Sequence, residues 1–152
     1  MEKTAATKDI SRLVRHLFKE CIAVRIRLIN RLITNEFDRE LEKYGITTSQ
    51  VAILGYLLSI HGGSPSDICK GLQIEKSTVS RNLARLKEKG WIAAAELRSD
   101  RSRKVVVTNE GIQTFERMFP SWEKALNKTK GMLGPSNVKL IHEITKSLGF
   151  EC

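Results

Sequence analysis

The chain has 152 residues, of which 41% are hydrophobic, and this composition excludes a disordered chain and fits one compact unit with helical extensions. Its 26 Lys and Arg residues outnumber 17 Asp and Glu residues, so the net charge of +9 favours a polyanionic partner such as nucleic acid. The longest largely apolar run, "VAILGYLLSI", is about half as long as a membrane-spanning helix, and arginines interrupt the N-terminal region before any signal-peptide core; we expect a cytoplasmic protein with no membrane partner.

A single very long helix is predicted for residues 10–41, because apolar residues recur three or four positions apart with no internal Gly or Pro. We expect this helix to bend near Asn35. It would be longer than a small domain is wide, so part of its apolar face needs a partner from outside the domain. A second subunit is the simplest such partner.

Two shorter helices follow. Thr47 and Gln50 form a capping box that begins the first, and its predicted buried stripe is Val51, Leu54 and Leu58. The glycines at 62 and 63 should end it. The second begins at "SPSD", which supplies an N-cap, a proline at the first helical position and an acid at the third.

The stretch "EKSTVSRNLARLKEKG", residues 75–90, predicts a helix that buries Val79, Leu83 and Leu86. Its opposite face carries Arg81 and Arg85, and small hydroxyl residues near its N-terminus permit close approach to a surface. The N–H groups and dipole at that end attract phosphate. Two short helices joined by a tight turn, with the second one basic, are typical of a helix-turn-helix whose second helix enters the major groove.

A β-hairpin is predicted after this helix, formed by "WIAAAEL" and "KVVV". Four cations surround Asp100 in its loop: Arg98, Arg101, Arg103 and Lys104. Such a loop can reach a DNA minor groove, where guanidinium groups suit the negative potential. Two further helices are expected, one from Asn109 with a bend at Pro120 and a last one that contains Val138 and Leu148.

The ordered set of segments "GITTSQVAIL", "KSTVSRNLARLKEKGWI" and "RSDRSRKVVVTNEG" resembles the multiple antibiotic resistance regulator (MarR) family of winged helix-turn-helix transcription factors. The resemblance covers nearly the whole chain. It implies a mainly α fold with a small β-hairpin wing, in which residues 1–44 and 109–152 form dimerisation helices around a DNA-binding domain at 45–108. It also implies a homodimer that binds a pseudo-palindromic operator in double-stranded DNA.

The resemblance implies DNA contacts by Ser77, Thr78, Ser80, Arg81 and Arg85 on the recognition helix and by Arg101 and Arg103 on the wing. The positive charge of the loop adds Arg98 and Lys104 to the candidates for DNA contact. Two departures from the family pattern concern geometry. Gln73 stands where the family usually has Gly, so either Gln73 adopts a left-handed conformation or Gly71 ends the helix earlier. Asp100 directly precedes Arg101, whereas the family's wing acid commonly lies two residues before the arginine.

Regulation by a ligand or an oxidant is also suggested by the resemblance. A small phenolic or anionic effector is implied, and Arg12, Arg15 and His16 could face its crevice. One branch of the family senses hydroperoxides with an N-terminal cysteine, and Cys21 occupies that region next to several cations. Cys21 also falls in phase with core positions, where a cysteine acts as a small apolar residue.

Catalysis, metal binding and cofactor binding are not supported by the sequence. The three histidines are far apart, the three cysteines form no CxxC pair, and no nucleophile elbow or phosphate-binding glycine loop is present. The favoured function is a sequence-specific DNA-binding regulator, a repressor that its ligand releases. The alternatives are an oxidant sensor that acts through Cys21, a nonspecific architectural DNA binder, and a protein-interaction module built on a winged helix.

Overall fold

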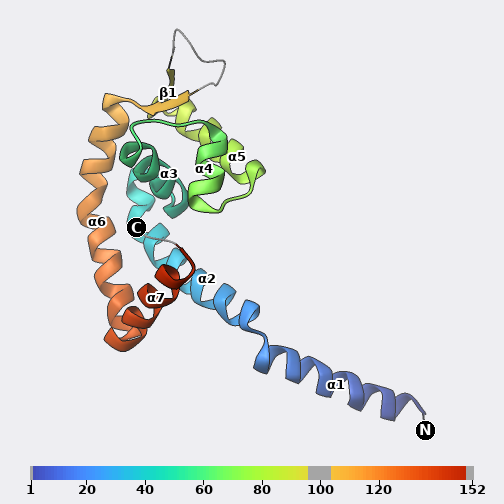
Figure 1. Cartoon of the computed structure of the whole chain (residues 1–152). Helices are drawn as coiled ribbons and strands as arrows, with labels where there is room; N and C mark the ends of the chain where they lie inside the picture. The colour runs from blue at the N-terminus through green and yellow to red at the C-terminus, as the bar shows by residue number, and fades with distance from the viewer. Residues whose placement is uncertain (1, 96–103, 150–152) are drawn as a thin grey trace. The chain divides into compact units, whose positions relative to one another are not determined.

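The computed structural model describes residues 2–95 and 104–149, and the chain divides into two compact units, Met1–Asn35 and Glu36–Cys152 (Figure 1). The first unit contains α1 (Glu2–Glu20) and most of α2 (Ile22–Leu41). The second contains the end of α2 and the remaining elements: η1 (Glu42–Tyr44), α3 (Thr48–Ser59), α4 (Pro65–Leu72), α5 (Lys76–Glu88), β1 (Ile92–Ala95), β2 (Lys104–Val107), α6 (Asn109–Leu133) and α7 (Pro135–Ser147).

The first unit corrects the prediction of one helix over residues 10–41. Helix begins at Glu2, is interrupted at Cys21, and then continues without a break through Asn35. The cause lies in Arg25, whose Nε donates to the carbonyl of Lys19 at 3.1 Å. A side chain that occupies a carbonyl of the helical ladder interrupts the helix at that point.

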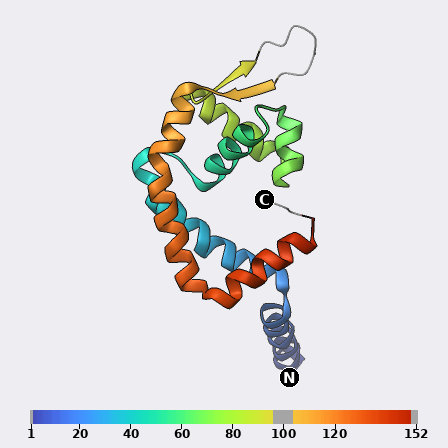
Figure 2. The same ribbon diagram turned by 60° about the vertical axis from the view of Figure 1, so that its left-hand side comes forward.

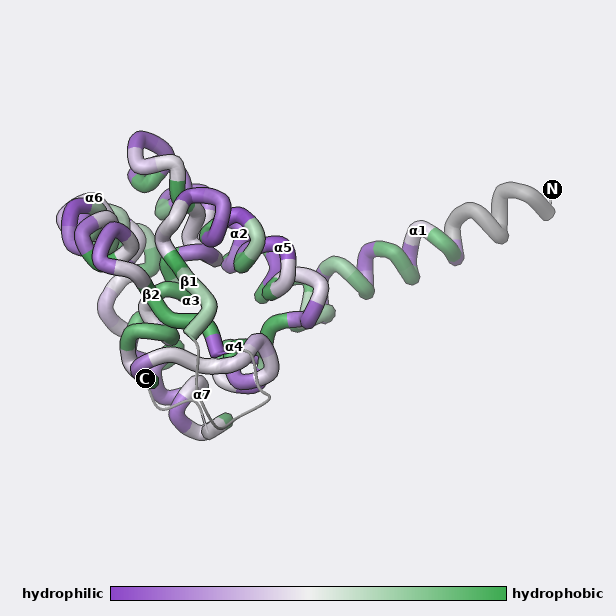
Figure 3. Tube along the Cα trace, turned by 90° about the horizontal axis from the view of Figure 1, so that it is seen from above, coloured by the Kyte–Doolittle hydropathy of each residue, from purple (hydrophilic) through white to green (hydrophobic). Residues whose placement is uncertain are grey.

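Apolar side chains of the first unit lie largely exposed. On α1 they share one side of the helix and are 49–62% exposed: Ile10, Leu13, Val14, Leu17 and Phe18. Hydrophobic residues of α1 appear as green segments of the tube in Figure 3. On α2, Ile22, Ile26 and Ile29 project from one side, while Leu28 and Leu32 project from another. None of residues 9–35, the part of this unit whose side-chain burial is described, is buried, so these residues form no hydrophobic core by themselves.

In the second unit, α3, α4 and α5 surround a common core. Its members with less than 2% exposure include Ile53, Leu54, Leu57, Ile68, Val79 and Leu86. The capping box of Thr47 and Gln50 at the start of α3 is confirmed. Leu57 takes the buried place predicted for Leu58, which is half-buried, and the helix ends at Ser59, before the predicted glycines.

The hairpin is confirmed as two antiparallel strands, with Ile92 opposite Val107 and Ala95 opposite Lys104. Gly63 adds a short third edge, because its N–H and carbonyl both bond to Val105. From this sheet α6 leads away and α7 turns back from its far end (Figure 2). α6 passes through Pro120 as one continuous helix.

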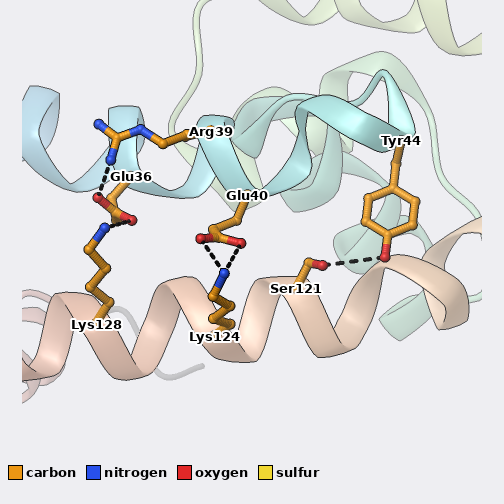
Figure 4. A network of polar contacts seen from close by, with 7 residues as sticks. All are labelled: Glu36, Arg39, Glu40, Tyr44, Ser121, Lys124 and Lys128. Carbon is orange, nitrogen blue, oxygen red and sulfur yellow. Dashed lines mark hydrogen bonds and ion pairs between the residues drawn. The ribbon is translucent and has the colours of Figure 1, made fainter.

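A row of polar contacts joins the end of α2 and η1 to α6 (Figure 4). The Glu36 side chain is only 7% exposed and pairs with Lys128 at 2.6 Å and Arg39 at 3.2 Å. Glu40 pairs with Lys124 at 2.9 Å, and this hydrogen bond holds the pKa of Glu40 below its ordinary value of 4.5. Tyr44 and Ser121 hydroxyls lie 3.3 Å apart. These contacts fix the register of α6 against the end of α2 and η1, which precede α3.

None of the helices in the described part of the chain combines the length and the apolar character that crossing a membrane requires.

Candidate nucleic-acid interface

Helix α5 is seated on the second unit by residues that share one side of the helix. Val79 and Leu86 are fully buried, and Asn82, which is 8% exposed, donates from Nδ2 to the carbonyl of Thr78 at 3.0 Å. Leu83, predicted to be buried, is half-buried. The buried amide of Asn82 thus has a hydrogen-bond partner within its own helix. Val79, Asn82 and Leu86 must face the core, so they fix the rotation of α5 and determine which residues face outward.

The opposite side of α5 presents the predicted contact residues. Ser77, Ser80, Arg81 and Arg85 are exposed, and Thr78 is half-buried at the edge of this face. Nη2 of Arg81 lies 3.5 Å from the Thr78 hydroxyl. Among residues 2–95 and 104–149 the other Arg81 donors have no hydrogen-bond partner, so they can contact a ligand. Residues 77, 81 and 85 recur one turn apart, which places their side chains in a row.

The N-terminus of α5 is suited to an anion. Glu75 occupies the N-cap position, yet its side chain makes no capping bond, and its carbonyl accepts the N–H groups of Thr78 and Val79. The N–H groups of the first turn therefore have no side-chain acceptor from the N-cap. Phosphate oxygens can bond to such groups.

The turn before α5 adopts the first of the two predicted geometries. Gln73 has φ 51° and ψ 43°, a left-handed conformation, and α4 extends to Leu72 rather than ending at Gly71. The Gln73 side chain donates to the carbonyl of Lys70 at 2.8 Å. This local bond offsets part of the steric cost of a side chain at a glycine-like position.

The start of α4 is held by the predicted capping residues. Ser64 and Asp67 bond to each other's backbone N–H groups in a reciprocal capping box, with Pro65 at the first helical position. The bond from the Ser64 N–H, followed by that from its hydroxyl, lowers the pKa of Asp67 below 3.8. The first helix of the helix-turn-helix is thus fixed by its own N-terminus.

Only the base of the wing belongs to the described residues. Lys104 opens β2, is half-buried, and contributes to the low pKa of Asp67 by its charge. Arg98, Arg101 and Arg103 lie outside the described residues, as does Asp100. Their contacts with DNA therefore stay predictions.

A junction that the sequence did not reveal ties α5, the wing and α6 together. The Thr108 hydroxyl donates to the carbonyl of Gly90 at 2.7 Å and accepts the N–H of Gly111 at 3.1 Å as the N-cap of α6. Lys89, just past α5, donates to the carbonyl of Gly45 and lies 4.6 Å over the Trp91 ring. The pair Thr108 and Gly111 is the one signal that could have indicated this role.

The predicted ligand and redox residues all lie in the first unit. Arg12, Arg15 and His16 are exposed on the polar side of α1, and Arg15 donates to the carbonyl of Ser11 at 3.4 Å. Cys21 is a free, partly exposed thiol at the break between α1 and α2. Their roles stay predictions. Within residues 2–95 and 104–149, the structure gathers no cluster of His, Cys, Asp and Glu able to hold a metal ion.

Comparison with known proteins shows which family and which regulators this chain resembles. Residues 44–101 match the model of the MarR family. The HTH-type transcriptional regulator YwoH of Bacillus subtilis is 32% identical over 58% of this chain and 64% of its own length, so this chain spans less than two thirds of YwoH. The HTH-type transcriptional regulator PrsX of Escherichia coli is 25% identical over 93% of both chains. The match over residues 44–101 and these relatives support a MarR-family winged-helix regulator.

Solved structures with the MarR-family fold are also similar to this chain. The S. aureus MepR–DNA complex is 26% identical, with a TM-score of 0.70 over 86% of this chain and 96% of that chain. The structure of Bordetella bronchiseptica BpsR, whose DNA binding 6-hydroxynicotinic acid regulates, is 24% identical, with a TM-score of 0.76 over 89% of this chain and 97% of that chain. The predicted winged helix-turn-helix fold is confirmed. The matched relatives are transcriptional regulators, which are not enzymes, so the prediction of a non-enzymatic protein is also confirmed.

Proposed function

We propose that this MarR-family regulator is a homodimeric repressor that binds a pseudo-palindromic operator through α5 and is released by a small ligand. The observation that carries the proposal is the face of α5, where exposed Ser77, Arg81 and Arg85 lie opposite the side that buries Val79 and Leu86. Small residues at the N-terminal turn allow close approach, and two arginines supply donors for base edges and phosphates. MepR, which shares this fold, is a DNA-bound relative.

Arg81 is the residue that we assign to base-edge contact, because it is exposed and lies near the N-terminal half of α5. We expect Arg81→Ala to weaken specific binding by about 1 to 3 kcal/mol and to relax the base preference at one position of each half-site. The wild-type protein and Arg81→Ala are each used to select duplexes from a random pool, and fluorescence anisotropy then compares the affinity of each protein for the selected duplex and for random duplex.

Arg117→Ala is the matched control, since Arg117 is an exposed arginine of α6 outside the α5 face and its loss removes the same charge. Unchanged affinity and base preference in Arg81→Ala would remove the assignment. If the wild-type protein binds selected and random duplexes with equal affinity, the architectural DNA binder is favoured. If it shows little salt-dependent binding to any duplex, the protein-interaction module is favoured.

A second copy of the chain is the proposed cover for the exposed apolar stripes. α1, both sides of α2, and α7 at Leu140, Ile144 and Leu148 carry apolar side chains that a lone chain leaves in water. Exposed apolar stripes of this kind are typical of protein interfaces. A twofold dimer would present two α5 helices to half-sites about 10 base pairs apart.

The effector is proposed to enter a cavity of about 300 Å³ between α3 and α6. Gly55 lies on its α3 side, and Phe115, Phe119 and Trp122 line its α6 side, with Phe119 stacked on Trp122 at 5.2 Å. The ring of an aromatic ligand fits such walls. The cavity joins the helix-turn-helix to α6, so a ligand there contacts both elements.

Gly55→Leu tests this assignment, because Gly55 lines the cavity and a Cβ atom added there would lie 3.7 Å from the Phe115 ring, an ordinary contact distance. With 6-hydroxynicotinic acid and salicylate as probes, we expect release of the wild-type protein from DNA and none for Gly55→Leu, which should still bind DNA. Release of both proteins alike would exclude this cavity. Release by peroxide that Cys21→Ser abolishes would favour the oxidant-sensing alternative instead.

A further inference from the structure

A single side chain joins the C-terminal end of α5 to the turn before α3. Lys89 is the C-cap residue of α5, and its ammonium group donates to the carbonyl of Gly45. Gly45 ends η1 in a left-handed conformation, with φ 63°, and a Cβ atom added there would lie 3.2 Å from the Lys89 ammonium nitrogen. Segments 44 residues apart in the sequence thus meet at this bond.

The Lys89 side chain is fixed at both of its ends. Its backbone N–H donates to the carbonyl of Arg85 at 3.2 Å, and its ammonium group lies 4.6 Å from the centre of the Trp91 ring. Trp91 is only 8% exposed, and its own N–H donates to the carbonyl of Leu86 at 3.0 Å, so its ring is held in the core. Because an indole ring attracts a cation, Lys89 is held in place although it lies at the surface.

The turn that receives Lys89 is itself anchored to α3. In α2, the Asp38 carboxylate accepts the backbone N–H of Thr48 at 2.7 Å and its hydroxyl at 2.6 Å. Thr48 is the first residue of α3, and Gly45 lies between these two partners in the sequence. The end of α2, the start of α3 and the end of α5 are therefore bonded to one short segment, and Lys89 supplies the bond to α5.

The orientation of α5 decides whether its outward face can contact base edges. With 13 residues the helix is about 20 Å long, so a tilt of about 5° about its Lys89 end moves the N-terminal turn by roughly 2 Å. Hydrogen bonds to bases fail over such a displacement, whereas attraction to phosphates acts over roughly 8 to 10 Å and barely changes. Loss of the bond to Gly45 should thus reduce sequence-specific binding and leave nonspecific binding largely intact.

We infer that Lys89 is a positioning residue for base recognition, which sets the angle at which α5 meets DNA by bonding to Gly45 and packing on Trp91. The inference rests on the proposed binding of operator DNA through α5. It extends that proposal, because it assigns sequence specificity to a residue whose ammonium group contacts protein rather than DNA.

The test compares wild type with Lys89→Met, which keeps an apolar side chain next to Trp91 and loses the charge and the donor. Fluorescence anisotropy at several salt concentrations measures the affinity of the full chain for the selected duplex and for random duplex. We expect Lys89→Met to bind the selected duplex about five-fold more weakly, or worse, and random duplex within about two-fold of wild type. The slope of log affinity against log salt concentration should stay the same, because no phosphate contact is lost.

Three further variants serve as controls. Lys89→Arg should restore binding of the selected duplex to within about two-fold of wild type, since a guanidinium group also donates to carbonyls and stacks on aromatic rings. Lys43→Met removes an exposed charge that lies 5.1 Å over the Tyr44 ring, close to Gly45, and should bind both duplexes like wild type. Lys76→Met, at the N-terminal end of α5, should weaken binding of both duplexes and reduce the salt slope by about one.

Several results would overturn the inference. One is wild-type affinity of Lys89→Met for the selected duplex, and another is an equal loss in Lys43→Met. Equal losses on both duplexes with a reduced salt slope would mean that Lys89 contacts a phosphate, and equal losses with loss of the circular dichroism signal would mean that it only maintains the fold. A wild-type protein that binds selected and random duplexes alike would refute the proposed function itself, and the wild-type titration alone shows this.

Discussion

Gly111 shows how a single missing side chain sets the geometry of the DNA-binding part. A Cβ atom there would lie 2.2 Å from the carbonyl oxygen of Trp91, which belongs to the backbone and cannot rotate away. The first turn of α6 therefore packs directly against the start of β1. The wing and α6 can approach this closely only with glycine at 111.

We expect Gly111→Ala to lower the free energy of unfolding by about 2 kcal/mol, because the backbone of Trp91 or of α6 must shift. Gly131→Ala is the matched control, since a Cβ atom there meets nothing and alanine favours a helix interior by roughly 0.5 to 1 kcal/mol. Urea denaturation of both variants measures the difference. A Gly111→Ala protein as stable as Gly131→Ala would show that the junction is not tightly packed.

At the scale of elements, the capping box of α4 makes its stability depend on pH. The folded-state pKa of Asp67 lies below its ordinary value of 3.8, because the charged carboxylate accepts bonds from Ser64. The stabilisation is thus present above the unfolded pKa and is lost as pH falls through the folded pKa.

Asp67→Asn tests this dependence. We expect wild type to melt at a higher temperature than Asp67→Asn between about pH 5 and 7, and the difference to shrink as pH falls below about 3.8. Melting followed by circular dichroism across this range is the measurement. A difference that stayed constant down to pH 2 would mean that the charge of Asp67 does not stabilise α4.

The ion pairs between α2 and α6 predict an order of effects. Lys128 neutralises Glu36, whose side chain is 7% exposed, whereas Lys124 neutralises Glu40, which is 17% exposed. We expect Lys128→Met to destabilise the protein by about 1 to 3 kcal/mol and Lys124→Met by less than about 1 kcal/mol, since a buried carboxylate left with fewer partners costs more. A double-mutant cycle with Glu36→Gln isolates the pair, and equal costs for the two lysine variants would contradict this order.

For the whole molecule, the proposed dimer predicts that charges on the apolar stripes dissociate it. Leu17→Glu and Ile144→Glu place carboxylates on stripes of α1 and α7 that are half-exposed in a single chain, at 52% and 48%. We expect both variants to sediment as monomers and to lose most of their affinity for a two-half-site operator. Lys19→Glu, on the polar side of α1 and 80% exposed, should remain dimeric. Dimers of unchanged affinity in both stripe variants would place the interface elsewhere.

Much of the fold could be predicted from local signals. The capping residues of α3 and α4, the β-branched run of β2 and the spacing in α5 each specify structure within a few residues, and the structure agrees. The break at Cys21 could not be predicted, because it depends on where the Arg25 side chain turns rather than on a Gly or Pro. That Leu57 rather than Leu58 is buried could not be predicted either, because the elements packed against α3 determine its rotation.

Within the candidate site, the residues on the exposed face of α5 could be predicted, because exposure on a helix follows from its periodicity. Ser77, Arg81 and Arg85 needed only the phase of α5. The junction residues Thr108, Lys89 and Gly45 are brought together by tertiary structure from three separate segments.

The Thr108 junction gives α6 the properties of a lever. With 25 residues, α6 is about 37 Å long, and at its start the wing base and the end of α5 are bonded to the same threonine. A tilt of about 5° about its α7 end would displace that start by roughly 3 Å, and α5 and the hairpin would travel together. In a twofold dimer the same tilt would occur in both protomers, so the distance between the two α5 helices would change by up to twice that displacement. This distance would then no longer match one turn of the double helix.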